Sequence, residues 1–344
     1  MRMIEIDGSM GEGGGQLLRT ALALSMCTGR PIRLRSIRAR RRQPGLRAQH
    51  LAAVNAAAAI CAASVSGAAL ASRELEFVPG AVRPGRYDID VGTAGSTLLV
   101  LQTILPPLAR CAAPSEIVLR GGTHNPLAPS FEFVRDAWAP LLTRLGIDVG
   151  LELVCHGFMP RGGGQVRARI GARRPGGTLE LLERGALRRW SARALLANLP
   201  EHIGQRELAT LRARLGLPEE ACRIEQVAAA GPGNAVLVEL AHEHVTTVFT
   251  GFGMRGVPAE TVAARTAEEI AAYVAAGVAV DRYLADQLLL PLALADGGRF
   301  STLAPSGHTT TNAALIGRFL PVEYAAREST PGRWIVSMQG AASA

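Results

Sequence analysis

The chain has 344 residues, 48% of them hydrophobic, so it is long enough for two domains and its composition excludes an intrinsically disordered chain. Its formal net charge is +8 and all 37 basic residues are arginine, which excludes a P-loop and covalent chemistry through a lysine amine. Genome-wide compositional bias is one explanation of the arginine excess. One dense cluster near the N-terminus fits either an anionic partner such as nucleic acid or a solvated basic face. Its members are Arg30, Arg33, Arg35, Arg38, Arg40, Arg41, Arg42 and Arg47.

The longest apolar stretches, such as residues 98–108, are too short to cross a bilayer. Residues 1–7 are typical of a strand, so we expect no secretion signal. The five cysteines are odd in number and include no C-x-x-C pair, which disfavours a disulfide framework or a thiolate metal site. These features predict a protein of the reducing cytoplasm without a membrane partner.

Two copies of one pattern follow each other in the first half of the chain, each with a strand, a glycine loop, a helix and a second helix. The first copy occupies residues 4–7, 8–15, 16–27 and 44–61, and the second occupies residues 87–90, 92–96, 97–108 and 125–145. The aspartates that end the two strands, Asp7 and Asp90, are 83 positions apart. Repeats on this scale predict an architecture built from copies of one α/β unit.

A third copy is expected to be split by an insertion. Residues 157–170 are interpreted as its turn and strand, while its two helices are expected only at residues 278–295 and 308–320. The predicted domains are therefore residues 1–182 with 278–344, and an inserted small domain at residues 183–277. In the insertion we expect helices at residues 191–199, 207–215 and 259–275, and strands at residues 235–240 and 245–250.

His308 lies where a glycine-containing loop enters the last predicted helix, flanked by hydroxyl side chains that can cap free backbone N–H groups. A helix start attracts anions, including phosphate, and an imidazole there can attack a phosphoryl group. His50 and His124 also stand near predicted helix starts, so from the residues alone a structural role for His308 stays open. His242 and His244 can share one side of a strand, but without a third ligand they predict no metal site.

Other candidates surround this helix start in our hypothesis. Glu12 lies in a glycine loop whose N–H groups can hold an anion, and its carboxylate can hold a metal ion; a simple turn is the alternative. Gln102 is a polar residue in an apolar helix, which fits either a ligand contact or a satisfied core amide. Arginine forks match phosphate geometry, and Arg19, Arg38 and Arg41 are the candidates for that role.

Four motifs make the sequence recognisable. They are Glu12-Gly-Gly-Gly-Gln-Leu-Leu-Arg19, Pro44-Gly-Leu-Arg-Ala-Gln-His-Leu51, Gly121-Gly-Thr-His-Asn-Pro126 and Tyr283-Leu-Ala-Asp-Gln-Leu288. With His308 downstream, they resemble the RNA 3′-terminal phosphate cyclases in order and spacing. The resemblance implies an α/β fold of the α+β type, with three repeated βαβαββ-like units as in EPSP synthase and a smaller inserted α/β domain.

The resemblance also implies a reaction and its residues. ATP would adenylylate a histidine, AMP would pass to an RNA 3′-phosphate, and the neighbouring 2′-hydroxyl would close a 2′,3′-cyclic phosphate. The position that matches the nucleophile is His308, and Glu12 matches a site for Mg²⁺ or Mn²⁺. Residues matching the ATP site are Gln102, Pro129, Tyr283, Leu284, Ala285, Asp286 and Gln287. Residues matching the phosphate- and RNA-facing wall are Arg19, Arg38, Arg41 and Gln49.

Two alternatives remain at this point. The family has a non-catalytic, ribosome-assembly branch without the nucleophile, and a carboxyvinyl transferase shares the implied architecture. The presence of His308 argues against the first, and the second would need a basic pocket but no covalent nucleotide.

Overall fold

A computed structural model describes residues 2–340 and shows one sheet topology used three times. The first unit contains β1 (Ile4–Asp7), α1 (Gly15–Thr28), β2 (Ile32–Arg35), α2 (Ala48–Cys61), β3 (Ser64–Ser66) and β4 (Leu75–Val78). Its sheet order is β1-β2-β4-β3, with β1 parallel to β2 and with β4 antiparallel to both β2 and β3. This is a βαβαββ unit.

The second unit repeats this arrangement in the order β5-β6-β8-β7. It contains β5 (Arg86–Asp90), α3 (Thr97–Leu108), β6 (Ser115–Gly121), a π-helical turn (Phe133–Trp138), α4 (Ala139–Arg144), β7 (Val149–Cys155) and β8 (Gly164–Ile170). Its second helix begins later than the predicted residue 125. Leu127 has a positive φ of 63°, and helical structure begins only after Ser130, whose Oγ accepts from the Phe133 N–H.

The third unit contains β9 (Leu179–Leu181), α7 (Arg282–Leu294), β14 (Gly298–Thr302), α8 (Gly307–Ile316), β15 (Val322–Thr330) and β16 (Arg333–Gly340). Its order, β15-β16-β14-β9, has the same parallel and antiparallel pairings. The assignment of residues 157–170 to this unit was wrong, because they end in β8, the last strand formed by the second unit. The three-residue strand β9 takes the place that β1 and β5 occupy in the other units.

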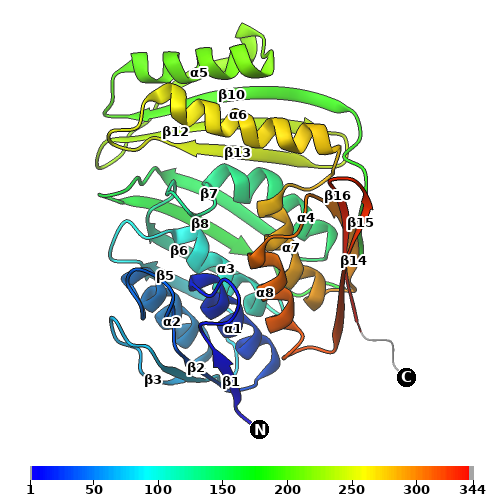
Figure 1. The fold of residues 1–344 in the computed structure, drawn as a ribbon. Coiled ribbons are helices and arrows are strands. Elements are labelled where there is room, and N and C mark those ends of the chain that lie inside the picture. Colours follow the sequence, from blue (N-terminus) through cyan, green and yellow to red (C-terminus); the bar gives the residue numbers. More distant parts are fainter. Residues whose placement is uncertain (1, 341–344) are drawn as a thin grey trace.

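The insertion forms its own sheet between β9 and α7 (Figure 1). It contains β10 (Leu187–Ala197), α5 (Glu201–Leu215), β11 (Cys222–Gln226), β12 (Gly233–His242), β13 (Thr246–Phe252) and α6 (Ala259–Ala276), with sheet order β11-β10-β12-β13. The helix predicted at residues 191–199 was wrong. That segment is rich in helix formers, but β10 pairs with β11 on one side and β12 on the other, so tertiary pairing overrides local propensity.

The helices of the three repeated units pack against one another, with α1 in contact with α2, α3 and α8, and with α7 in contact with α8. Figure 1 shows these helices gathered in the middle and the sheets around them. Leu22, Leu101 and Leu315, one from each unit, are fully buried in one continuous core. This packing brings the start of α8 to the glycine loop before α1. Within residues 2–340, no helix has the length and apolar character needed to cross a membrane.

Glu207 on α5 is a buried acid inside the insertion. The Asn234 amide donates to its Oε2 at 3.0 Å, whereas its Oε1 has no hydrogen-bond partner among the described residues. Burial raises its pKa from 4.5 to about 7, against a smaller lowering by the Asn234 hydrogen bond. The folded protein therefore holds this proton at pH values where the unfolded chain has lost it.

Replacing Glu207 with Gln removes this titration. In wild type the free energy of unfolding should fall by up to about 3 kcal/mol between pH 4.5 and about 7, as expected from the shift in the pKa of Glu207, and it should stay low above pH 7. Urea unfolding should therefore show Glu207→Gln gaining stability over wild type at pH 8 and losing that gain near pH 4.5. Glu201→Gln, an exposed position on the same helix, is the control. A difference that does not change with pH would contradict the buried titration.

Candidate active site

The start of α8 is held by a reciprocal pair of caps. Ser306 Oγ accepts from the Thr309 N–H at 3.0 Å, and Thr309 Oγ1 accepts from the Ser306 N–H at 3.2 Å. This places His308 in the first turn of the helix, where the unpaired N–H groups and the helix dipole favour negative charge. The His308 side chain is 41% exposed, so the imidazole is accessible.

Asp286 of α7 binds both side chains of this cap. Ser306 Oγ donates to Asp286 Oδ1 at 3.1 Å, and Thr309 Oγ1 also donates to Oδ1. Burial raises the pKa of Asp286, while these two hydroxyl groups and then His308 lower it. The carboxylate expected to bind ATP therefore binds the loop that carries His308, so the structure brings Asp286 and His308 together.

The imidazole of His308 has two different surroundings. Its Nδ1 is buried and has no hydrogen-bond partner in the described part of the chain. Its Nε2 lies 3.8 Å from Glu12 Oε2, on the side of the glycine loop. Nε2 is therefore the ring nitrogen that faces the partly exposed Glu12 carboxylate.

The backbone of the glycine loop lies close to the start of α8. The Glu12 N–H donates to Thr311 Oγ1 at 3.2 Å, and that hydroxyl donates to the Gly307 carbonyl at 2.6 Å. A Cβ at Gly307 would lie 2.7 Å from Glu12 Cγ, and one at Gly11 would lie 2.0 Å from Thr311 Oγ1. Glycine at both positions is what permits the contact.

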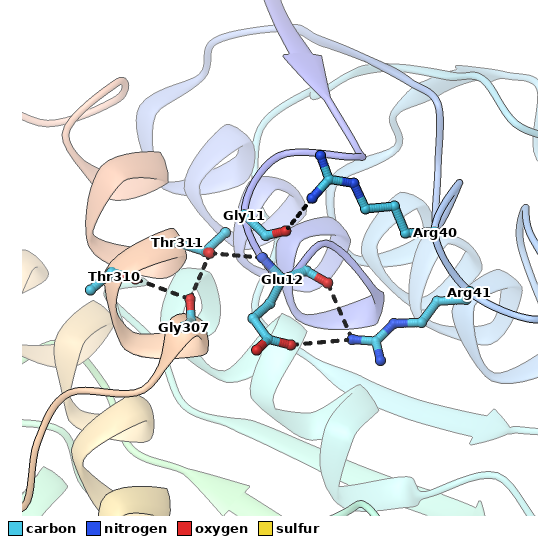
Figure 2. A pocket seen from close by; sticks show the side chains of 7 residues that line it. All are labelled: Gly11, Glu12, Arg40, Arg41, Gly307, Thr310 and Thr311. Atoms are coloured by element: carbon cyan, nitrogen blue, oxygen red, sulfur yellow. Dashed lines mark hydrogen bonds and ion pairs between the residues drawn. The ribbon is translucent and has the colours of Figure 1, made fainter.

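A pocket of about 390 Å³ opens between this loop and α8. It is lined by Gly11, Glu12, Arg40, Arg41, Gly307, Thr310 and Thr311. Figure 2 shows both arginines reaching the loop from one side and the start of α8 facing them from the other. Arg40 Nη1 donates to the Gly11 carbonyl at 3.3 Å, and Arg41 Nη2 donates to the Glu12 carbonyl at 3.2 Å while lying 3.8 Å from its Oε2.

The charges around this pocket favour a phosphate-bearing ligand. Two guanidinium groups and a helix N-terminus outweigh the one carboxylate of Glu12. The Glu12 carboxylate is 45% exposed, so it can share a divalent cation with a phosphate. The sequence had pointed to Glu12 and Arg41. It missed Arg40 and the threonines, whose only signals were the basic cluster and the hydroxyl groups around His308.

Arg19 and His50 lie behind the same loop at Gly15, where a Cβ would be 2.8 Å from Arg19 Nη1 and 2.5 Å from His50 Nε2. Burial, with Arg38, Arg19 and Arg47, lowers the His50 pKa to about 3, so its ring is neutral. Since Nδ1 accepts from the Arg47 N–H at 3.1 Å, the proton is assigned to Nε2. Burial also lowers the Arg19 pKa to about 10, and the guanidinium stays charged at neutral pH.

Arg38 and Gln49 were expected in the phosphate- and RNA-facing wall, but both bind backbone groups of the protein itself. Arg38 Nη1 donates to the carbonyls of Gln43 and Gly45 at 2.8 and 3.0 Å. Gln49 Oε1 accepts from the Ser96 N–H at 2.9 Å, at the start of α3. These side chains shape the loop before α2 and tie the first unit to the second.

The other expected ATP-site residues divide between surface and core. Gln102 on α3 has a buried Nε2 without a hydrogen-bond partner among residues 2–340, which fits a ligand contact. Leu284 and Ala285 are buried in the core and Pro129 is half-buried.

Tyr283 and Gln287 of α7 are the remaining members of that set. Tyr283 is 47% exposed, its hydroxyl accepts from Arg282 Nη2 at 2.6 Å, and the Arg282 guanidinium lies 4.6 Å from its ring centre. Gln287 is half-buried, and its backbone carbonyl accepts from Trp138 Nε1 at 3.1 Å.

Among solved structures, one match is the enolpyruvyl transferase NikO from Streptomyces tendae. The TM-score is 0.33 at 10% identity, and the match covers 98% of this chain but only 48% of that one.

Closer likeness comes from sequence relatives. The family model described as RNA 3′-terminal phosphate cyclase matches residues 10–326. A protein of that name from Ralstonia nicotianae is 51% identical over 327 residues, covering 93% of this chain and 92% of the relative. One from Pseudomonas aeruginosa is 52% identical over 323 residues, covering 93% of both, and one from Koribacter versatilis is 49% identical over 325 residues, covering 94% and 92%. These matches along nearly the whole length show that the chain belongs to the RNA 3′-terminal phosphate cyclase family.

Proposed function

We propose that this protein is an ATP-dependent RNA 3′-phosphate cyclase that works through a covalent histidine–AMP intermediate. The observation that carries the proposal is the position of His308, in a chain of this family. It stands at a helix start with Nε2 toward Glu12, beside a pocket of about 390 Å³ that Arg40 and Arg41 line. Charge and nucleophile are thus next to each other, as phosphoryl transfer requires.

In the first step, Nε2 of His308 attacks the α-phosphorus of ATP. The nitrogen–phosphorus bond forms as the bond to the β-phosphate oxygen breaks, and pyrophosphate leaves. Arg40, Arg41 and the N–H groups at the start of α8 stabilise the charge that develops on the phosphate oxygens. Asp286 keeps the loop in place through Ser306 and Thr309, so the imidazole need not be reoriented during the reaction.

In the second step, an oxygen of the RNA 3′-phosphate attacks the AMP phosphorus and the imidazole leaves. In the third step, the neighbouring 2′-hydroxyl attacks the RNA phosphorus, its proton is lost, and AMP leaves with the bridging oxygen. The RNA then ends in a 2′,3′-cyclic phosphate. Protonated imidazole is a good leaving group near neutral pH, which suits a histidine intermediate that must form and then break.

Glu12 fits the Mg²⁺ or Mn²⁺ that the family implies, because its partly exposed carboxylate offers the hard oxygen ligand these ions prefer. When bound, such an ion neutralises phosphate charge in the transition state. Arg41 lies 3.8 Å from the same carboxylate and orients it toward the pocket.

The covalent bond provides the sharpest test of the mechanism. With ATP labelled at the α-phosphate, wild type should retain AMP in a bond that is lost in mild acid and survives alkali, as expected for a nitrogen–phosphorus bond. His308→Asn should retain no label and still bind ATP, because Gln102 and Tyr283 are unchanged.

The control for this labelling is His244→Asn, an exposed histidine of the insertion, which should label like wild type. If His308→Asn still carries covalent AMP, the assigned nucleophile is wrong. If wild type never retains AMP, the chain acts as a non-catalytic RNA-binding member or as a carboxyvinyl transferase.

The substrate assignment predicts which RNA end reacts. Purified protein with ATP and Mg²⁺ should convert an oligoribonucleotide ending in 3′-phosphate to the cyclic form, because only that end supplies the oxygen that accepts AMP. The same oligonucleotide ending in 3′-hydroxyl should remain unchanged on a denaturing gel. Equal reaction at both ends would rule out the proposed substrate.

RNA binding should depend on salt, since each phosphate contact releases counterions. Replacing Arg41 with Gln should make the slope of log K against log salt shallower by about 0.7 for a single strand. The control is Arg206→Gln, whose guanidinium pairs with Glu260 in the insertion. Fluorescence anisotropy over a salt series gives the slope. A slope unaltered by Arg41→Gln would mean that this arginine meets no RNA phosphate.

A further inference from the structure

Outside the pocket, three side chains with metal-binding atoms meet at the edge of the second unit. His124 follows β6, Glu132 stands at the start of the helical run before α4, and His156 follows β7. Their ligand atoms all lie within 4.8 Å of one another. His124 and Glu132 are buried, with 1% and 3% exposure, and His156 is half-buried. The chain therefore brings two imidazoles and one carboxylate together in a mostly buried cluster.

The inner pair is already in contact. His124 Nε2 lies 2.8 Å from Glu132 Oε2. The His156 ring stacks on His124 with centres 5.3 Å apart. An ion pair between His124 and Glu132 explains two of the three groups. It leaves unexplained why a third polar ring packs against them.

Supporting groups orient the inner pair. Thr123 Oγ1 accepts from the Gly157 N–H at 2.9 Å and lies 2.8 Å from His124 Nδ1, so it can accept a hydrogen bond from Nδ1–H and leave Nε2 free as a ligand. On the other side, Arg193 Nη2 lies 3.9 Å from Glu132 Oε1, which leaves Oε2 toward the histidines. Hydrogen-bonded supports of this kind are typical of metal-binding histidines and carboxylates.

We propose that His124, Glu132 and His156 bind one divalent transition-metal ion of the zinc class, with a fourth position open to water at His156. Two imidazoles and a carboxylate are a ligand set that zinc uses, whereas Mg²⁺ prefers oxygen ligands alone. Binding replaces the proton between His124 and Glu132. The two atoms then separate from 2.8 Å to roughly 3.4 Å, the spacing of ligands around a tetrahedral zinc ion.

The charge of the surroundings allows such an ion. Arg193 is the cation close to the cluster, and it also pairs with Glu225 at 3.5 Å. Glu225 also pairs with Arg223 at 2.6 Å, so the two carboxylates and two guanidinium groups balance, and with neutral imidazoles the group carries no net positive charge before a metal binds. The position of the site would give a bound ion a structural role. It would join the loop after β6 to the loop after β7, next to the Ser130–Thr250 contact (2.9 Å) with the insertion.

The test uses chelator-treated full-length protein, with Zn²⁺ and Co²⁺ as separate probes. Equilibrium dialysis should show one Zn²⁺ per chain, and Co²⁺ should give the visible absorption of a tetrahedral nitrogen–oxygen site. His156→Gln and Glu132→Gln should each lose that equivalent and the thermal stabilisation that Zn²⁺ gives. His156 is half-buried, so its variant should fold even if Glu132→Gln does not, and circular dichroism checks this.

Two controls separate this site from others. His244→Gln, an exposed histidine, should bind Zn²⁺ like wild type. His308→Asn should also keep the equivalent, because the proposed ion does not depend on the catalytic pocket, so failure of the proposed cyclase activity would leave this result unaffected.

Several outcomes would overturn the proposal. If wild type holds no Zn²⁺ beyond the level of His156→Gln, the cluster is an ion pair with a stacked ring. A thiolate-to-cobalt charge-transfer band would assign the metal to a cysteine instead. Loss of the equivalent in His308→Asn would assign it to the Glu12 pocket.

Discussion

The contact between the glycine loop and the start of α8 is the constraint on which the candidate site depends. One backbone N–H, that of Glu12, donates to a threonine hydroxyl 299 residues away, and that hydroxyl donates to the Gly307 carbonyl. The contact requires glycine at Gly11 and Gly307, because any Cβ there would overlap the opposite side. It sets the distance between Glu12 and His308, which lie on the two sides of this contact.

The repeated units make this contact possible. Helices α1 and α8 belong to the first and third units, and they pack directly because each unit buries the apolar face of its helices against the others. The insertion enters the third unit between β9 and α7, so α7 and β14 separate it from α8 along the chain. It forms its own sheet and a second core cluster, so an added segment of this size leaves the pairing of β9 with β14 intact.

Polar groups near the site are of two kinds. Some bind groups of the protein itself, and others line the pocket. Asp286, Arg38 and Gln49 are used inside the protein, where each binds a backbone group or a cap. Arg40 and Arg41 also donate to carbonyls, but their guanidinium groups line the pocket and can bind a further anion. Arginines of the same short cluster therefore have different partners, and we expect them to respond differently to substitution.

Local sequence patterns were sufficient for much of the fold. The short alternating strand of residues 4–7 and the apolar helix of residues 97–108 have the predicted bounds, because their periodicity and flanking glycines act over a few residues. The repeat could also be recognised in the sequence, because the same order of strand, glycine loop and helices occurs twice in the first half of the chain. The candidate nucleophile and Glu12 could be named in advance from their motifs, while their assigned roles stay proposals.

Only the tertiary structure decided the rest. Residues 191–199 have the composition of a helix, but residues 191–197 form a strand, because hydrogen bonds to β11 and β12 are made with segments distant in sequence. The role of β8 in the second unit and of β9 in the third likewise depends on which strand each one pairs with. The position of Arg40 in the pocket, the anchoring of Asp286 and the meeting of His124 with His156 depend on packing between elements, and no short-range pattern specifies that packing.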